Sequence, residues 1–380
     1  MKLGIIGLGT VGLGVVEILT NEKERLEKEF NEEITIKYGC ALEDVTLPKG
    51  IIYTTNYKEV LDDDEVDTIV ELIGGTTIAK DIILESFNKG KNVITANKAL
   101  IAHYAKELFE AANNNNCHFF YEASVGGGIP VVVPEKESLI ANNIKKIEGI
   151  LNGTTNYILT SMEEDNLSFE EALDIARDKG FVEANEALDL DGIDAAHKIA
   201  ILTMNAYHRY INFDQIICDG IRNVTKTDMK ICDQLGYKIK LIARSELHDG
   251  KIYIDVSPTL IPKGDLVASV NSSYNVVEIT NDYVENVIFY GKGAGRYVTA
   301  SAVCADILKT INHPTWQYND YVDEANVYPI TESKYYIRTS YPLDLKDVKE
   351  YKINDQYVYI TEKIEKNTLK DIDGHIFRVR

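Results

Sequence analysis

The chain has 380 residues, more than the roughly 100 to 200 of a single domain, so we expect two domains and exclude a small disulfide-held scaffold. Its 40 basic and 60 acidic residues give a formal net charge of −20, which argues against nucleic acid or a membrane surface as a partner. The five scattered cysteines form no C-x-x-C pair, and no apolar stretch reaches the roughly 20 residues of a membrane helix, so we expect a soluble, cytoplasmic protein without a zinc site.

Short apolar runs alternate with helix-period segments in the first third of the chain. This alternation favours parallel strands with right-handed crossovers, and it predicts an α/β fold with a doubly wound, Rossmann-type sheet. The strands are expected at residues 3–6, 34–38, 51–54, 68–72, 92–94 and 119–121. We assign residues 1–130 to this first domain.

A glycine-rich loop lies between the first expected strand and the first expected helix. Its sequence is Gly7-Leu8-Gly9-Thr10-Val11-Gly12, which has the G-x-G-x-x-G spacing of a dinucleotide site. The first glycine permits a tight turn, the second lets the backbone approach a pyrophosphate, and the third allows close packing of helix on strand. The loop therefore predicts that Gly7, Gly9, Thr10, Val11 and Gly12 bind the cofactor.

The loop after the second expected strand contains two acids, Glu43 and Asp44. An acid at this place can accept hydrogen bonds from the adenosine ribose, and it repels a 2′-phosphate. Glu43 therefore favours NAD as the cofactor, with NADP as the alternative. A loop acid exposed to solvent without any role stays an equal possibility at this point, and Lys49 lies close enough to complicate the choice.

Three further loops follow the carboxyl ends of expected strands, where doubly wound sheets bind ligands. The first contains Gly75 and Thr76, which can pass close to a ribose or the nicotinamide. The second places Lys98 at the start of a helix, within reach of a reacting carbonyl, although surface lysines are common. The third contains three consecutive glycines, residues 126–128, and implies either tight packing or carbonyl groups directed at a ligand.

The pattern changes after residue 130 and predicts a second, α+β domain over residues 131–296. Helical periods occur at residues 156–163, 169–178 and 192–207, and strand-like stretches at 238–254 and 276–290, with a hairpin turn at His248-Asp249-Gly250. A helix at about residues 297–312 is expected to complete the first domain. Residues 331–380 form a small extension with strand-like runs at 335–339 and 357–361, too short for a large core of their own.

Asp194 and Lys198 are four residues apart on an expected helix, so their side chains share one face. They can line a pocket together. The alternative is an exposed ion pair that contributes roughly 0.3 to 0.5 kcal/mol. His197 lies about 100° around the helix from Lys198, and we interpret its role as structural.

Taken together, these segments resemble the homoserine dehydrogenase family over about residues 1–312. The matching blocks are residues 7–12, 95–99, 121–130, 151–157, 183–198, and 291–295 with 299–302. The resemblance implies reversible, nicotinamide-dependent interconversion of L-homoserine and L-aspartate 4-semialdehyde, on the route to threonine, isoleucine and methionine. It also implies a homodimer.

The resemblance assigns roles by motif position. Lys198 matches the proton donor or acceptor, and Lys98 matches a residue that assists at the same site and contacts the cofactor. Glu183 and Asp194 match the acids that hold the substrate ammonium, and Gly295 matches a position near the cofactor. This agrees with the chemistry, because hydride transfer to an aldehyde creates an alkoxide that needs a proton, and an amino-acid substrate needs fixed carboxylates.

The family also holds a structural monovalent cation, usually sodium, with backbone oxygens that match Glu122, Val125, Gly127 and Ile129.

Two departures from the family pattern stand out. Glu43 replaces the arginine of many NADP-using relatives, which supports NAD. Residues 185–186 replace a common Asp-Pro pair and leave the neighbouring acids in place.

Two other functions compete with this hypothesis. An aspartate-semialdehyde dehydrogenase would need an activated cysteine nucleophile, and no cysteine lies in a recognisable nucleophile motif. A dinucleotide-binding sensor without activity would not need the acids and lysines assigned to the site, which are Lys98, Glu183, Asp194 and Lys198. The threonine response of the C-terminal extension stays open.

Overall fold

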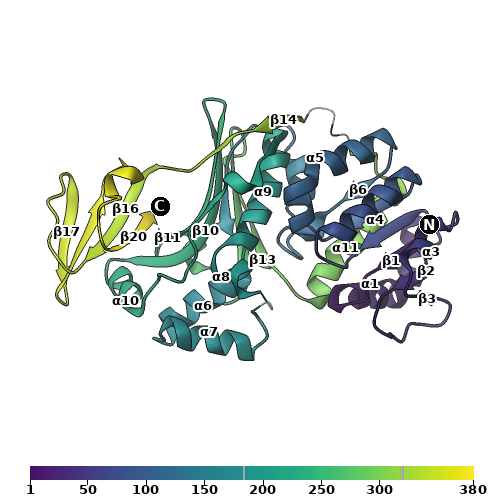
Figure 1. Ribbon diagram of the computed structural model, residues 1–380, viewed down its shortest axis with the longest axis horizontal. Coiled ribbons are helices and arrows are strands. Elements are labelled where there is room, and N and C mark those ends of the chain that lie inside the picture. The colour runs from purple at the N-terminus through teal and green to yellow at the C-terminus, as the bar shows by residue number, and fades with distance from the viewer. Residues whose placement is uncertain (183–184, 317, 319–320) are drawn as a thin grey trace. The chain divides into compact units, whose positions relative to one another are not determined.

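A parallel sheet forms the centre of the first unit in the computed structural model, which describes residues 1–182, 185–316, 318 and 321–380 (Figure 1). The strand order is β3-β2-β1-β4-β5-β6, which is the Rossmann order, and all neighbours are parallel. The predicted strands are confirmed. They are β1 (Lys2–Ile6), β2 (Thr35–Cys40), β3 (Ile52–Thr54), β4 (Thr68–Glu71), β5 (Asn92–Thr95) and β6 (Phe119–Phe120).

Helices connect these strands. They are α1 (Thr10–Asn21), α2 (Lys23–Phe30), α3 (Tyr57–Asp62), α4 (Thr77–Asn88) and α5 (Lys98–Asn114). The later helix α11 (Arg296–Asn312) packs beside α1 in the same unit. Gly14 lets the two helices approach closely, because an added Cβ would lie 3.0 Å from the Cβ of Ala300. Glu17 joins them further by pairing with Arg296 at 2.8 Å.

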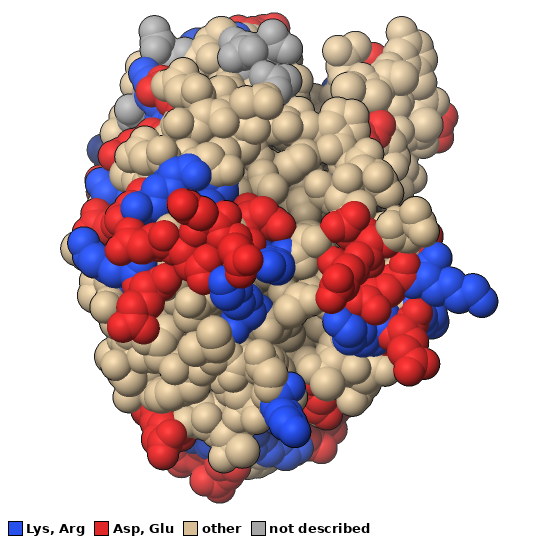
Figure 2. All heavy atoms as spheres, turned by 90° about the vertical axis from the view of Figure 1, so that its right-hand side faces the viewer, with Lys and Arg blue, Asp and Glu red and all other residues tan. Residues whose placement is uncertain are grey.

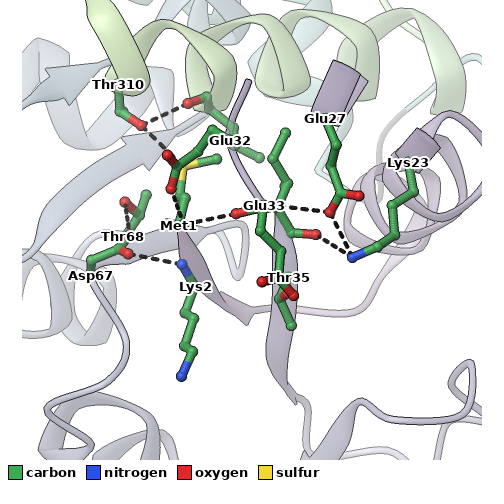
Figure 3. Close-up of polar contacts among 12 residues, drawn as sticks. Met1, Lys2, Lys23, Glu27, Glu32, Glu33, Thr35, Asp67, Thr68 and Thr310 are labelled. Carbon is green, nitrogen blue, oxygen red and sulfur yellow. Dashed lines mark hydrogen bonds and ion pairs between the residues drawn. The ribbon is translucent and has the colours of Figure 1, made fainter. Parts of the chain in front are cut away.

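Polar side chains fix the points at which β1 and β2 begin (Figure 3). The backbone N–H of Lys2 donates to the Asp67 carboxylate at 2.8 Å, and the N–H of Ile34 donates to Glu27 at 2.9 Å. The Glu27 carboxylate also pairs with Lys23 at 2.8 Å. Backbone groups at the ends of the strands are therefore satisfied before the ladder starts.

A mixed sheet forms the second unit, which comprises Asn142–Ala200, Asn212–Gly291 and Ala325–Arg380. Its first strands are β7 (Ile144–Ile150), β10 (Tyr237–His248), β11 (Lys251–Pro262), β12 (Tyr274–Asn281) and β13 (Asn286–Lys292). The predicted hairpin turn is confirmed, because His248 pairs with Lys251 across Asp249 and Gly250, both of which have positive φ.

Among the described residues, five helices lie between the strands of this sheet in the chain; α6 contacts β10 and β12, α10 contacts β10, and α7 and α8 contact α6. The five helices are α6 (Gly153–Glu164), α7 (Phe169–Asp178), α8 (Glu186–Leu190), α9 (Ile193–Tyr207) and α10 (Lys226–Gln234). Helix α7 begins with a capping box formed by Ser168 and Glu171. The buried core beneath α6 contains Ile150, Ile242 and Val276.

The C-terminal strands continue the same sheet. They are β16 (Glu332–Thr339), β17 (Val348–Ile353), β18 (Gln356–Thr361) and β20 (His375–Val379). Strand β20 pairs with both β11 and β16, so it joins the last fifty residues to the body of the second unit. The shorter strands are β8 (Arg209–Ile211), β9 (Ile217–Cys218), β14 (Val322–Ala325), β15 (Val327–Tyr328) and β19 (Ile364–Glu365).

The surface carries its charges as mixed clusters. Figure 2 shows acidic and basic side chains lying next to each other on the face that it draws. Ion pairs such as Lys37 with Asp63, at 2.5 Å, are typical of the first unit. Among the described helices, none combines the length and apolarity that crossing a membrane requires.

Candidate active site

The glycine loop makes the tight turn that the sequence predicts. Gly7 follows β1 with φ of 105°, a conformation that strains other residues, and its N–H donates to the carbonyl of Cys40 at 2.9 Å. An added Cβ on Gly12 would overlap the carbonyl oxygen of Gly7. The loop can therefore close on the first turn of α1 only with glycine at both positions.

Gly9 leaves room for a ligand at the start of α1. Apart from Gly9 and its two chain neighbours, no described residue places a heavy atom within 4 Å of the position that a Cβ of Gly9 would occupy. No described side chain caps this end of α1, so its first N–H groups have no side-chain acceptor. Gly9 and Thr10 are exposed, and Val11 is half-buried. An open helix N-terminus of this kind suits a pyrophosphate.

Glu43 lies in an exposed loop beside the glycine loop. Its backbone carbonyl accepts a hydrogen bond from the hydroxyl of Tyr53 at 3.0 Å, while its side chain stays exposed. Leu8 of the glycine loop packs against Gly39 of β2, which brings the two loops together. The position fits contact with a ribose, and that contact stays a prediction.

A buried carboxylate that the sequence analysis did not select links two of the cofactor loops. Glu71, at the end of β4, is fully buried and accepts hydrogen bonds from the hydroxyl of Thr95 at 2.7 Å and from the N–H of Ile73 at 2.8 Å. Burial raises its pKa, and these hydrogen bonds oppose the rise. The signal in the sequence was an acid that ends an apolar strand.

The loops after β4 and β5 contact each other. The side chain of Asn97 donates to the carbonyl of Gly75 at 2.6 Å and accepts from the N–H of Leu100 at 3.1 Å, so it also caps α5. Lys98 is the first residue of α5 and is half-buried, and Thr76 precedes α4. Gly75, Thr76 and Lys98 thus share the carboxyl edge of the sheet, where the sequence predicts them.

Close packing accounts for the run of three glycines. An added Cβ on Gly127 would overlap the carbonyl of Gly293, and one on Gly128 would lie 2.7 Å from Val298. Gly295, with φ of 138°, then begins α11. The loops at residues 122–130 and 292–295 are therefore held together within the first unit.

The Glu122 carboxylate organises the same loop. It accepts hydrogen bonds from the N–H groups of Val131, Val132 and Val133 at 2.6 to 2.9 Å. Burial raises its pKa, and the three N–H groups oppose the rise. The backbone N–H of Glu122 donates to Asp306 at 2.8 Å.

A second cluster of polar groups is buried in the second unit. The ammonium of Lys198 contacts the carboxylate of Asp194 and the carbonyl of Leu151, both at 2.7 Å. Lys198 is 8% exposed and Asp194 is 3% exposed. The alternative interpretation of these two residues as an exposed ion pair is therefore wrong. Glu183, the other acid assigned to the substrate, lies outside the described residues.

Asn152 connects this pair to a further acid. Its side-chain amide donates to Asp194 at 2.9 Å and to Asp189 at 2.7 Å. Asp189 comes from α8, Asp194 and Lys198 come from α9, and Asn152 precedes α6. The neighbouring His197 is buried and stacks on Phe213, with ring centroids 4.6 Å apart, in agreement with a structural role.

The cysteines are poor nucleophiles. Burial raises the pKa of Cys117 and Cys218 to about 11 and that of Cys304 to about 12, and it also raises the pKa of Cys40 and Cys232. The thiolate is the reactive form, so these thiols stay protonated near neutral pH. This argues against a mechanism with a thiohemiacetal intermediate.

The fold and the glycine loop define a dinucleotide-binding oxidoreductase of the Rossmann class. A family model described as "Homoserine dehydrogenase, NAD binding domain" matches residues 7–122, and one described as "Homoserine dehydrogenase" matches residues 130–308. The chain belongs to the homoserine dehydrogenase family, and it is an NAD(P)-dependent enzyme.

Individual relatives agree with this placement. The homoserine dehydrogenase of a Synechocystis strain is 41% identical over 318 residues, which cover 82% of this chain and 73% of the relative. The crystal structure of a homoserine dehydrogenase from Thiobacillus denitrificans matches with a TM-score of 0.91 at 31% identity and covers 100% of this chain and 98% of that one. A hyperthermophilic archaeal homoserine dehydrogenase mutant in complex with NADPH matches with a TM-score of 0.70 at 26% identity, over 81% and 97% of the two chains.

Proposed function

We propose that this chain interconverts L-homoserine and L-aspartate 4-semialdehyde with NAD(P), a step towards threonine, methionine and isoleucine. Family membership supports the reaction. The buried contact between Lys198 and Asp194 carries the assignment of the site, because it places an ammonium and a carboxylate together in the second unit. An amino-acid substrate with a reacting hydroxyl needs both groups.

The proposed chemistry divides the work between the cofactor and the side chains. A nicotinamide held in the first unit would supply the acceptor for the hydride of the carbinol carbon of homoserine. Lys198 takes the hydroxyl proton in this direction when it is the neutral amine, and as the ammonium it returns the proton to the oxygen in the reverse reaction. Glu183 and Asp194 hold the substrate ammonium by charge, and Lys98 assists at the reacting oxygen.

The nucleotide is proposed to bind residues 1–130 together with α11. Three features support this: the turn at Gly7, the open space at Gly9 and the close packing at Gly12. Thr10 and Val11 begin the helix that faces the pyrophosphate, and Gly75, Thr76, Lys98 and Gly295 line the remaining part of the nucleotide site. Glu43 at the ribose favours NAD over NADP, since a carboxylate repels a 2′-phosphate.

A monovalent cation, in the family usually sodium, is proposed to bind the carbonyl oxygens of Glu122, Val125, Gly127 and Ile129. In the described part of the chain, no backbone N–H donates to the carbonyls of Val125, Gly127 or Ile129. Oxygen donors of this kind suit hard cations. The ion would hold the loop that Glu122 already organises, which is a structural role.

We also propose that residues 131–296 bind the substrate and form a homodimer, and that the protein acts in the cytoplasm. The edge strand β13 supports an interface, because it exposes Ile288 and Tyr290. Light scattering of the purified chain measures the oligomeric state. A monomer at micromolar concentration would contradict the dimer.

The test is a steady-state assay with homoserine, in which absorbance reports the reduced nicotinamide. Lys198→Ala should lower kcat by at least about a hundredfold, because general acid–base catalysis contributes roughly 10² to 10⁴. Nucleotide affinity, measured by fluorescence, should stay unchanged. The exposed Lys230 supplies the control, since Lys230→Ala should retain full activity.

Two outcomes would contradict the proposal. An unmodified chain that binds the nucleotide but gives no absorbance change with homoserine or the semialdehyde would instead favour a sensor. A Lys198→Ala variant with full turnover would remove the proton-transfer role and leave the reaction in place.

A further inference from the structure

The segment Leu151 to Tyr157 matches the family without a role in the chemistry described so far. In the structure it contacts the site directly. The carbonyl of Leu151 accepts a hydrogen bond from Lys198, and the side chain of Asn152 reaches two carboxylates. The neutral side-chain amide of Asn152 therefore touches both Asp189 and Asp194.

The orientation of the Asn152 amide is fixed by its own helix. Its oxygen accepts hydrogen bonds from the N–H of Thr155 at 2.8 Å and from the Thr155 hydroxyl at 2.9 Å. A backbone N–H can only donate, so the amide oxygen must face α6 and the amide NH₂ must face the acids. The N-cap of α6 thus determines which group the carboxylates meet.

Burial makes this donor important. Asn152 is 4% exposed and Asp189 is 2% exposed. Two carboxylates that share a buried site repel each other, and one of them tends to take a proton unless donors stabilise the charge. The charged groups in direct contact with the Asn152 side chain are Asp189 of α8 and Asp194 of α9, and Lys198 contacts Asp194.

We propose that Asn152 is a positioning residue, which holds Asp189 and Asp194 ionised and aligned beside Lys198. This inference rests on the proposed function. An ionised Asp194 can attract the substrate ammonium while it keeps Lys198 next to the carbonyl of Leu151. Asn152 itself does not need to touch the substrate.

Two variants separate the donor from the helix cap. Asn152→Ser and Asn152→Asp both keep a side-chain oxygen that can accept from Thr155, because serine and aspartate are good N-cap residues. Both remove the NH₂ group that faces the acids. Asn152→Ser should therefore unfold near the temperature of the unmodified chain, whereas the third buried carboxylate of Asn152→Asp should lower the unfolding temperature at neutral pH.

The expected readout is the pH dependence of kcat/KM for homoserine. Both variants should lose at least tenfold in kcat/KM, and the acid limb of the profile should move to higher pH, with the larger shift in Asn152→Asp, which adds a third carboxylate. Nucleotide affinity should not change. These effects distinguish a positioning role from a loss of folded protein, which lowers activity equally at every pH.

Asn156 provides the matched control on the same helix. It is 1% exposed, and its side chain contacts the carbonyls of Val270 and Tyr274 and the ammonium of Lys240, without an acid among these partners. Asn156→Ala should lower the unfolding temperature and leave the shape of the pH profile unchanged.

The outcomes are distinct. If the pH profiles of the Asn152 variants superimpose on that of an active unmodified chain, the positioning role is overturned and the proposed function still holds. An unmodified chain that is inactive with homoserine would overturn both.

Discussion

We propose that the choice of coenzyme depends on the exposed side chain of Glu43. Glu43 lies in the loop after β2, next to the glycine loop, and its side chain is exposed, which leaves room for its replacement. Its negative charge is therefore available to a ribose or to the 2′-phosphate that distinguishes NADP. The neighbouring Asp44 is exposed as well and is the alternative that the sequence left open.

Glu43→Arg should shift the preference towards NADPH by at least tenfold in the ratio of the two kcat/KM values. The reason is that a guanidinium attracts the 2′-phosphate that the carboxylate repels. The assay compares both coenzymes at fixed homoserine. Asp44→Arg is the matched variant. If Asp44→Arg changes the coenzyme preference and Glu43→Arg does not, then Asp44 contacts the ribose and Glu43 does not.

At the scale of elements, one buried acid joins α10 to two C-terminal strands. Asp228 is 0% exposed and contacts Arg338 of β16 at 2.6 Å and His375 of β20 at 3.1 Å. It also caps α10 through Thr225. Burial alone would raise the pKa of Asp228, but the hydrogen bonds from His375, Arg338 and Thr225 outweigh it and hold the pKa well below the usual range.

Asp228→Asn should lower the free energy of unfolding by roughly 3 to 5 kcal/mol at pH 7, because Arg338 is left buried without its counter-charge. Urea unfolding measures this value. The folded pKa is lowered, so the contribution of Asp228 is present above the unfolded pKa of about 4 and is lost as the pH falls below it. The difference between the two proteins should therefore shrink in acid.

Asp233 is the control on the same helix. It pairs with Lys263 at 2.5 Å, but both side chains are exposed. Asp233→Asn should cost no more than about 1 kcal/mol at any pH. Equal effects at both positions would show that the buried network adds nothing to the stability of the second unit.

At the scale of the whole molecule, the last fifty residues belong to the sheet of the second unit. Strand β20 pairs with β11, and Arg378 of β20 forms a buried ion pair with Asp255 of β11. Arg380 contacts Glu148 of β7 at 2.9 Å. The C-terminal segment therefore contributes positive charge to two buried acids, and Glu148 also pairs with Lys146 and Arg244.

A chain that ends at residue 330 should unfold at a lower temperature and expose the edge of β11. Removal of the two arginines leaves the buried Asp255 without its ion-pair partner and leaves Glu148 with only Lys146 and Arg244, which is destabilising. Calorimetry measures the change. Neutral replacements of both acids in the shortened chain, Asp255→Asn and Glu148→Gln, should recover part of the loss in unfolding temperature.

The opposite result is also informative. A shortened chain with an unchanged unfolding temperature would show that residues 331–380 add no stability to the second unit.

Local patterns in the sequence determined the first sheet, the glycine loop, the hairpin at His248 to Gly250 and the family. Each of these depends on residues that are neighbours in the chain: the alternation of apolar runs, the spacing of three glycines, or the residues of one turn. The same reasoning selected Asp194 and Lys198 because a helix brings residues four apart onto one face.

Only the tertiary structure decided that Asp194 and Lys198 are buried, and only it brought Glu71 and Asn152 to their hydrogen-bond partners. Asn152 reaches Asp194 across 42 positions of the chain, and Glu71 reaches Thr95 across 24. The pairing of β20 with β11 is of the same kind. Residue spacing predicts only which side chains share a face of one helix or strand. Burial and charge compensation arise when elements that are distant in sequence pack together and exclude water.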